Sequence, residues 1–419
     1  MENPKPIRPI LRVWTHRDYA LFMVGCIPNY ITFWMQRVGI GWLAWDLTHS
    51  TFWLGLVTAI DLAPLLLLAP IAGVLVDRWG ALRQFRITQI GVMVHAAALP
   101  ALYFTGRMNI EALVALTLFS GIVYPFMSTA RLGVLPRILP RDILASGIGL
   151  DSTFFHGSRF VGPAIAALLI PLYGVGATFV VNALGSAGLM ISLWMISLRP
   201  AEGEPRKAKT LFADVGEAFS YVRHHKGIGP IFLLLTIAST FTRPIQDMLP
   251  GIAGSVFHAG PEGLAWLTSA LGIGAMISAA WIATRGRVSG LTTVIMTGAF
   301  NVSIGSIALV MTDQLMFGIP FAVLIGFSLN TMSTSVQTLV QSAVSDDMRG
   351  RVMSLYVMIF RGAPALGSLV IGLISDRLGL TPTFLLAGCL GLVSWGVSMP
   401  KRQQIAASLE TPHNIGGRS

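Results

Sequence analysis

Residues 52–76 read FWLGLVTAIDLAPLLLLAPIAGVLV, an apolar run in which Asp61 is the single charged side chain. A helix needs about 20 predominantly apolar residues to cross the hydrocarbon core of a bilayer. This run is long enough, and it ends at a polar stretch that reads Asp77-Arg78-Trp79-Gly80-Ala81-Leu82-Arg83. The pattern predicts a transmembrane helix that is followed by a short basic loop.

Comparable apolar runs recur along the whole chain. Charged residues make up only 11% of the 419 residues, whereas soluble domains carry roughly 25%, and the mean hydropathy is +0.69. Six runs precede a polar linker and six follow it, so we expect an all-α membrane protein with twelve transmembrane helices in two pseudo-symmetric halves. The halves are 1–198 and 228–400, the linker is 199–227, and the tail is 401–419. The expected spans are 19–45, 52–76, 85–105, 110–130, 145–171, 176–198, 228–250, 263–283, 291–311, 316–340, 352–375 and 381–399.

The positions of the basic residues support this count. With the N-terminus placed in the cytoplasm, 23 of the 29 Lys and Arg residues fall in cytoplasmic segments. Two, Arg107 and Arg377, fall on the opposite side. The positive-inside rule requires such an asymmetry, and one missed span would invert every later loop. We therefore expect a multi-pass protein of the bacterial inner membrane with both termini and the linker in the cytoplasm.

The linker carries apolar residues at helical spacing, namely Leu211, Val215, Phe219 and Val222. This spacing predicts a short amphipathic helix on the cytoplasmic surface of the membrane. A simple tether between the halves is the alternative interpretation.

The chain also repeats internally. When it is shifted by 205 residues, the end of span 4 through span 6 overlays the end of span 10 through span 12 without a gap. Gly157 then meets Gly362, and Gly162 meets Gly367. Parallel repeats of six spans are typical of carriers whose substrate site lies at the bilayer midplane between the halves.

The loop after span 2 reads Gly73-Val-Leu-Val-Asp77-Arg78-Trp-Gly80-Ala-Leu-Arg83. It resembles the signature of the major facilitator superfamily, a loop that braces one conformation of these transporters. The resemblance implies this role for Gly73, Asp77, Arg78, Gly80 and Arg83, although Ala81 and Leu82 stand where the family has paired basic residues. Because Gly372–Gly379 has the same spacing on the far side, the spacing is also typical of an ordinary helix terminator.

Three further segments resemble the enterobactin-exporter and macrolide-efflux branch of this superfamily. They begin at Gly41, Leu135 and Arg349, and the resemblance runs through most of residues 10–400. Span 5 adds Gly157-Ser-Arg-Phe-Val-Gly162-Pro163, which is similar to a glycine-rich motif of antiporter branches and equally typical of a packing kink. The resemblance implies efflux of a bulky small molecule of the multidrug or siderophore kind.

Four arginines fall inside the expected spans, where each costs roughly 2.5–3.5 kcal/mol and so needs a partner, a cavity or a function. They lie on spans 1 and 7 and on spans 5 and 11, which are counterparts in the two halves. A guanidinium offers a planar fork of donors to carboxylate or catecholate oxygens, so these arginines predict an anionic or hydrogen-bond-accepting substrate. Salt-bridged gates are the alternative. The predicted binding residues are Arg37, Arg159, Arg243, Arg361, Asn29 and Gln36.

Acidic residues inside the spans suggest proton coupling. The candidate carboxylates are Asp61 on span 2, which is favoured, and Asp151 on span 5. His156, also on span 5, is a further candidate for proton coupling. Low dielectric disfavours the charged form of a carboxylate, and alternating access could switch it between two environments. Asp247 is expected to pair with Arg243 one turn before it on the same helix.

Other functions lack their motifs in the sequence. There is no nucleotide-binding loop, no metal-ligand spacing of His and Cys, and no nucleophile–base arrangement. We therefore expect no cofactor, no nucleic-acid partner and no enzyme activity, but a monomeric secondary transporter that exchanges protons for a small molecule in the lipid bilayer. An importer, a lipid-type flippase and a non-transporting receptor are the alternatives.

Overall fold

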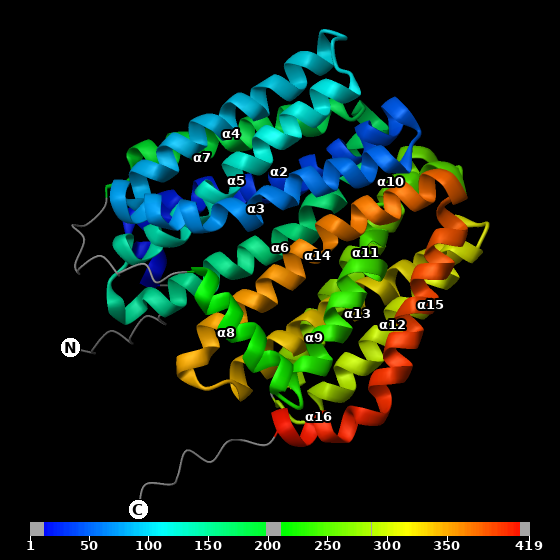
Figure 1. The fold of residues 1–419 in the computed structure, drawn as a ribbon. Coiled ribbons are helices and arrows are strands. Elements are labelled where there is room, and N and C mark those ends of the chain that lie inside the picture. Colours follow the sequence, from blue (N-terminus) through cyan, green and yellow to red (C-terminus); the bar gives the residue numbers. More distant parts are fainter. Residues whose placement is uncertain (1–11, 198–210, 286, 411–419) are drawn as a thin grey trace, which may run out of the picture. The chain divides into compact units, whose positions relative to one another are not determined.

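The computed structural model describes residues 12–197, 211–285 and 287–410, and every regular element in these ranges is helical (Figure 1). The longer helices are α2 Arg17–Thr48, α3 Thr51–Trp79, α4 Ala81–Phe104, α5 Ile110–Ile138, α6 Arg141–Tyr173, α7 Gly176–Met195, α8 Leu211–His224, α9 Ile228–Ile237, α11 Gly260–Arg285, α12 Leu291–Met311, α13 Leu315–Ala343, α14 Asp346–Leu378, α15 Leu380–Ser398 and α16 Arg402–Leu409. Short helical turns are η1 Val13–Thr15, η2 Ala238–Thr242, η3 Arg243–Gln246, α10 Leu249–Gly251, η4 Ile252–Val256 and η5 Met399–Lys401.

Eleven helices of the described ranges are long and apolar enough to cross a membrane. Helix α2 is not among them although it has 32 residues. Its buried polar side chains, which include Asn29 and Gln36, lower its hydropathy. The fold is thus the all-α membrane architecture that the sequence predicts.

The internal repeat is confirmed at the level of whole helices. Helices α5 and α13 each have 29 residues, helices α6 and α14 each have 33, and both pairs begin and end at positions 205 residues apart. The glycines that follow α6 and α14 also correspond, since Gly174 has φ 77° and ψ 167° and Gly379 has φ 88° and ψ 161°. The two segments therefore share helix lengths and the backbone conformation that ends the second helix.

The described residues form two compact units. Of the described residues, unit 1 contains 12–43 and 63–197, and unit 2 contains 44–62, 211–285 and 287–410. In unit 1, α4 packs against α5 and α7. In unit 2, α13 packs between α11 and α12, and α12 packs against α15, as Figure 1 shows.

The segment 44–62 packs within unit 2, which the sequence did not indicate. The Thr51 hydroxyl donates to the carbonyl of Gly372 at 3.1 Å, and the Ser50 hydroxyl donates to Asp376 at 2.6 Å. A Cβ at Gly55 would collide with the carbonyl oxygen of Ser368. Glycine at this position lets the start of α3 approach the backbone of α14.

The seventh span is broken into short turns. Helix α9 is followed by a π-helical turn at Ala238–Thr242, a 3-10 turn at Arg243–Gln246 and a second π-helical turn at Ile252–Val256. Pro244 and Pro250 lie in this region and cannot donate a backbone hydrogen bond. Turns of this kind inside a helix frequently mark functional positions.

Two short helices outside the expected spans, α8 and α16, pack within unit 2. The helix predicted in the linker is confirmed as α8, whose Val222 is buried in the core of the unit, and Glu217 of α8 pairs with Arg351 at 2.7 Å. Within the segment expected as a tail, α16 buries Ile405 and Leu409 in the same core. The carboxylate of Glu410 then accepts a hydrogen bond from the backbone N–H of Thr292, at the start of α12.

Candidate functional site

Two of the four predicted arginines, both in unit 1, lie over the same aromatic ring. The guanidinium carbon of Arg37, on α2, is 5.5 Å from the ring centroid of Trp34. That of Arg159, on α6, is 4.9 Å from the same centroid. Because Trp34 and Arg37 are three residues apart, they share a face of α2. The structure therefore brings together predicted residues from the first and fifth spans.

Gly162 explains how α6 comes close enough to place Arg159 there. A Cβ at this position would lie 2.5 Å from the carbonyl oxygen of Ile31 and 2.7 Å from Cβ of Trp34. A Cβ at Gly157 would meet nothing within 4 Å. Of the two glycines of the span-5 motif, only Gly162 is thus required for close packing of the described residues.

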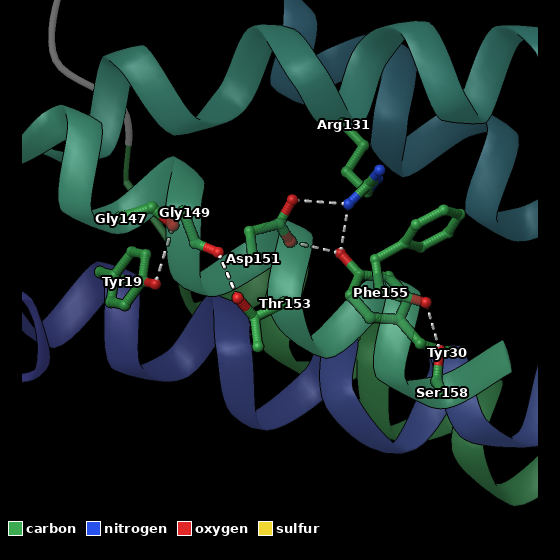
Figure 2. A network of polar contacts seen from close by, with 9 residues as sticks. All are labelled: Tyr19, Tyr30, Arg131, Gly147, Gly149, Asp151, Thr153, Phe155 and Ser158. Carbon is green, nitrogen blue, oxygen red and sulfur yellow. Dashed lines mark hydrogen bonds and ion pairs between the residues drawn. The ribbon is translucent and has the colours of Figure 1, made fainter. Parts of the chain in front are cut away.

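A second cluster lies between α2, α5 and α6 (Figure 2). Arg131 forms an ion pair with Asp151 at 2.7 Å, and both side chains are largely buried, with 11% and 3% of their surface exposed. The Tyr30 hydroxyl donates to the other carboxylate oxygen of Asp151 at 2.7 Å and accepts from Arg131 at 2.7 Å. Both oxygens of the carboxylate are therefore hydrogen-bonded.

Aromatic rings surround this ion pair. The guanidinium carbon of Arg131 lies 4.7 Å from the ring centroid of Phe155 and 5.1 Å from that of Tyr30. Phe155 also contacts Trp34 edge-on at 6.5 Å. Phe155 thus connects the Arg131–Asp151 pair to the ring that carries Arg37 and Arg159.

Arg131 is not among the predicted site residues, because the expected fourth span ends at residue 130 and leaves Arg131 in a cytoplasmic loop. Helix α5 continues to Ile138 with Pro136 inside its last turn, so Arg131 and Arg137 are helical residues. The signal that could have found Arg131 is its place directly after an apolar run, with Leu132, Val134 and Leu135 continuing the apolar pattern beyond it. Asp151 was predicted, and its partner was not.

Asn29 and Gln36 lie on another face of α2 and are buried against α7. Asn29 donates to the Ser186 hydroxyl at 3.2 Å, and Gln36 accepts a hydrogen bond from Asn182. Only 6% and 5% of these two residues is exposed. Their hydrogen bonds therefore serve helix packing inside unit 1.

In unit 2, Arg243 lies over the ring of Phe360 at 4.3 Å and donates to the carbonyl oxygen of the same residue. Asp247 accepts a hydrogen bond from the Ser368 hydroxyl at 2.8 Å. Arg243 begins the 3-10 turn Arg243–Gln246, and Asp247 follows this turn directly. The expected pairing of Arg243 with Asp247 stays a prediction. Arg361 is partly buried and makes no hydrogen bond or ion pair with another described residue.

The two units share one feature of this chemistry. Phe155 and Phe360 are 205 residues apart, and each carries an arginine on its ring, Arg131 in unit 1 and Arg243 in unit 2. Gly162 and Gly367 are related in the same way, and a Cβ at Gly367 would collide with the carbonyl oxygen of Thr240. The repeat therefore preserves the close helix approach. The two corresponding phenylalanines each contact an arginine, but these arginines come from non-equivalent elements, α5 and the 3-10 turn η3.

The remaining predicted residues are placed as follows. Gly80 lies between α3 and α4 with φ 81° and ψ 142°, a conformation that glycine alone adopts readily. Arg78 and Arg83 are exposed, a Cβ at Gly73 would meet nothing within 4 Å, and the side chain of Asp77 lies outside the described atoms. Asp61 is partly buried on α3 and His156 is exposed on α6, and each has an interaction partner.

Metal chemistry finds no support within the described residues, where no group of three or more His, Cys, Asp or Glu side chains could hold an ion. The site is instead built from arginines, aromatic rings and one buried carboxylate. Such groups can bind an anion or exchange a proton.

A family model described as transmembrane secretion effector matches residues 15–410. The chain is 23% identical to the staphyloferrin A transporter of Staphylococcus aureus, over 90% of this chain and 95% of that protein. It is 22% identical to macrolide efflux protein A of Streptococcus pyogenes, over 90% and 94%. It is 23% identical to the multidrug efflux pump Tap of Mycolicibacterium fortuitum, over 83% and 87%.

Solved structures show the same fold. The nucleoside transporter NupG superposes with a TM-score of 0.69 at 13% identity, covering 92% of this chain and 99% of that one. A bacterial homologue of the human lysosomal transporter Spinster gives 0.67 at 14% identity, covering 94% and 99%.

Proposed function

Because the chain belongs to the transmembrane secretion effector family of major facilitator transporters, we propose that it exports a bulky anionic small molecule in exchange for protons. Family membership makes it a multi-pass membrane transporter of small molecules and not an enzyme. The proposal adds the substrate's charge, the coupling ion, the inner membrane as the location, a monomeric state, and a cytoplasmic position for both termini. The similarity to efflux proteins for a macrolide and for several drugs supports the direction of transport.

The observation that carries the proposal is the pair of guanidiniums over Trp34. Arg37 and Arg159 come from different helices, and both lie within 5.5 Å of one ring centroid. Both arginines have other interactions as well, and two positive charges beside one ring favour an anion there whatever those interactions are. The aromatic face then offers contact area to a bulky substrate.

Not every predicted arginine fits this role equally. Arg243 donates to a backbone carbonyl and stacks on Phe360, so its contacts favour the alternative role of a structural or gating residue. Arg361, which lacks a described hydrogen-bond partner, is the better substrate-binding candidate of unit 2.

For proton coupling we propose Asp61 or Asp151. Asp151 is held by Arg131 and Tyr30, so taking up a proton at this carboxylate requires the Arg131 contact to open. A movement of α5 relative to α6 would open it, which would connect protonation to a change in helix packing. Asp61 is partly buried on α3, and His156 is an exposed titratable group of α6.

An accumulation assay with a panel of compounds, in cells that lack the gene, first identifies a transported compound. Flux of that compound is then measured in proteoliposomes with an imposed pH gradient, for Asp61→Asn, Asp151→Asn and the exposed control Asp46→Asn. We expect one of the first two changes to abolish gradient-driven flux while exchange persists. Full gradient-driven flux in both would rule out these carboxylates as coupling groups.

The charge of the substrate has its own test. Anionic and cationic compounds of similar size are compared as competitors, and Arg37→Lys and Arg159→Lys are compared with wild type. Lysine keeps the charge but loses the planar fork, so the apparent KM for an anion should rise. Stronger competition by cations would leave these arginines as structural gates. Uptake instead of extrusion in cells would make the protein an importer.

A further inference from the structure

The geometry points to Trp34 as a direct ligand donor. We infer that its indole N–H binds a carboxylate or phenolate oxygen of an aromatic anion, between the guanidiniums of Arg37 and Arg159. This inference rests on the proposed export of an anion, and it names the chemistry of the group that is recognised.

The first observation is an unused hydrogen-bond donor. Nε1 of Trp34 is buried and has no hydrogen-bond acceptor among the described residues. Buried polar groups are nearly always paired, because an unpaired donor loses its hydration without compensation. Tryptophan offers only this one donor and no acceptor. The missing partner must therefore be an acceptor.

The second observation is the local charge. The guanidinium carbons of Arg37 and Arg159 lie 5.5 and 4.9 Å from the Trp34 centroid, so a negatively charged acceptor is favoured over a neutral one. Both arginines have other interactions as well, and the inference requires only that their charges lie beside the ring. Hydrogen bonds to ionised acceptors are roughly twice as strong as those between neutral groups.

The third observation is the aromatic surroundings. Phe33 contacts Trp34 edge-on at 5.4 Å and stacks on Tyr124 at 5.3 Å with an interplanar angle of 13°. Phe155 lies 6.5 Å from Trp34 on the α6 side. Rings arranged in this way accept a further planar ring by stacking or edge contact. An aromatic carboxylate or phenolate therefore fits better than an aliphatic anion.

The test uses the purified full chain with ¹⁵N-labelled indole groups and follows the indole N–H signals by NMR. The Trp34 signal is the one that disappears in Trp34→Phe. Three planar probes of nearly equal shape, benzoate, benzamide and benzamidinium, differ in charge and carry two, one and no acceptor oxygens. We expect benzoate to shift the Trp34 signal downfield in a saturable way, benzamide to shift it weakly, and benzamidinium to leave it unchanged.

Trp194 supplies the matched control. Its ring also carries an arginine, with Arg86 at 5.0 Å, but its Nε1–H already donates to the sulfur of Met190 at 3.3 Å. The Trp194 signal should not move with benzoate. Trp34→Phe should weaken benzoate binding, followed by calorimetry, about tenfold, and Trp194→Phe should not. An unchanged Trp34 signal, or equal shifts with all three probes, would overturn the inference.

The outcomes separate this inference from the proposed function. A saturable benzoate shift in a protein that shows no export would keep the subsite and reject export. Export of an aromatic anion with an unchanged KM in Trp34→Phe would keep export and reject the subsite.

Discussion

Arg131 and Asp151 form an ion pair in the interior of unit 1, and Tyr30 bonds to both partners. A buried ion pair adds little folding stability compared with a well-packed apolar pair, but removing one partner leaves an uncompensated buried charge. The pair therefore couples three helices, α2, α5 and α6, in a way that tolerates joint replacement better than single replacement. At an exposed ion pair, by contrast, single and joint replacement should both have little effect on stability.

We predict that Arg131→Met lowers the free energy of unfolding by about 3–5 kcal/mol. The double variant Arg131→Met/Asp151→Leu should recover a large part of this loss, because no charge then remains buried. Denaturant unfolding in detergent micelles measures both.

The exposed pair Arg12–Asp142 is the matched control. It has the same chemistry at 3.0 Å, but about half of each side chain is exposed, 54% and 53%. Its loss through Arg12→Met should cost about 0–1 kcal/mol. Equal effects of Arg12→Met and Arg131→Met would contradict the prediction.

Some of the candidate site residues could be predicted from the sequence, and others could not. Arg37, Arg159 and Asp151 could be selected because a charge inside an apolar run is costly wherever the helix packs. Trp34 and Phe155 could not, since aromatic residues in a span carry no such signal. Asn29 and Gln36 share a face of α2, but the sequence does not say that α7 covers this face.

Helix α6 touches α2 at Gly162, and this contact sets the position of Arg159 over Trp34. A methyl group at Gly162 would meet backbone, the carbonyl oxygen of Ile31, which cannot rotate away. The helices would have to separate, and Arg159 would move with α6. Overpacking of this kind costs typically about 1–3 kcal/mol.

We predict that Gly162→Ala lowers the stability by about 1–3 kcal/mol and reduces transport, whereas Gly157→Ala has neither effect. Gly157 lies on the same helix with open space at its Cβ, and alanine favours a helix by about 1 kcal/mol over glycine. Thermal unfolding and flux in proteoliposomes are the measurements. Identical behaviour of the two variants would show that close packing at Gly162 does not position Arg159.

The ends of helices were the least predictable elements. The fourth span was expected to end at residue 130, yet α5 continues to Ile138, because a proline in the last turn does not stop a helix that neighbours support. In the seventh span the apolar pattern predicts one continuous helix, but the backbone forms π-helical and 3-10 turns there. Hydropathy locates a span but does not reveal how its backbone hydrogen bonds are arranged.

Helix α16 should stabilise unit 2. Ile405 and Leu409 are buried in its core, and Glu410 accepts a hydrogen bond from the first turn of α12, where a negative charge is favourable. We predict that truncation after Lys401 destabilises the protein, whereas truncation after Glu410 leaves the thermal midpoint unchanged. Equal midpoints for both truncations would show that α16 contributes nothing to stability.

At the scale of the whole molecule, composition and repeat were sufficient for the fold. A bilayer accepts only helices or closed barrels, so low charge and repeated apolar runs leave few architectures. The 205-residue repeat then appears as equal helix lengths in α5 and α13 and in α6 and α14. The path of Ala44–Leu62, which packs within unit 2, depends on contacts between distant residues such as Thr51 and Gly372, which hydropathy does not encode.

The orientation of the whole molecule in the membrane provides the last prediction. Of the 29 basic residues, 23 fall on one side in the expected topology and two on the other. Translocating a short loop that carries Lys or Arg is disfavoured, so the basic side should stay in the cytoplasm. We predict that alkaline phosphatase fused after Ser419 or within 199–210 is inactive, and that the same enzyme inserted after Arg107 is active.

Green fluorescent protein at the same three positions supplies the reciprocal measurement, because it becomes fluorescent only in the cytoplasm. It should be fluorescent after Ser419 and within 199–210, and dark after Arg107. Phosphatase activity after Ser419 would invert the second half of the chain. That half is expected to contain six spans, which places the linker and Ser419 on the same side. Activity after Ser419 together with inactivity at the linker would instead require an odd number of spans after residue 210. The architecture of two six-span halves would then be wrong.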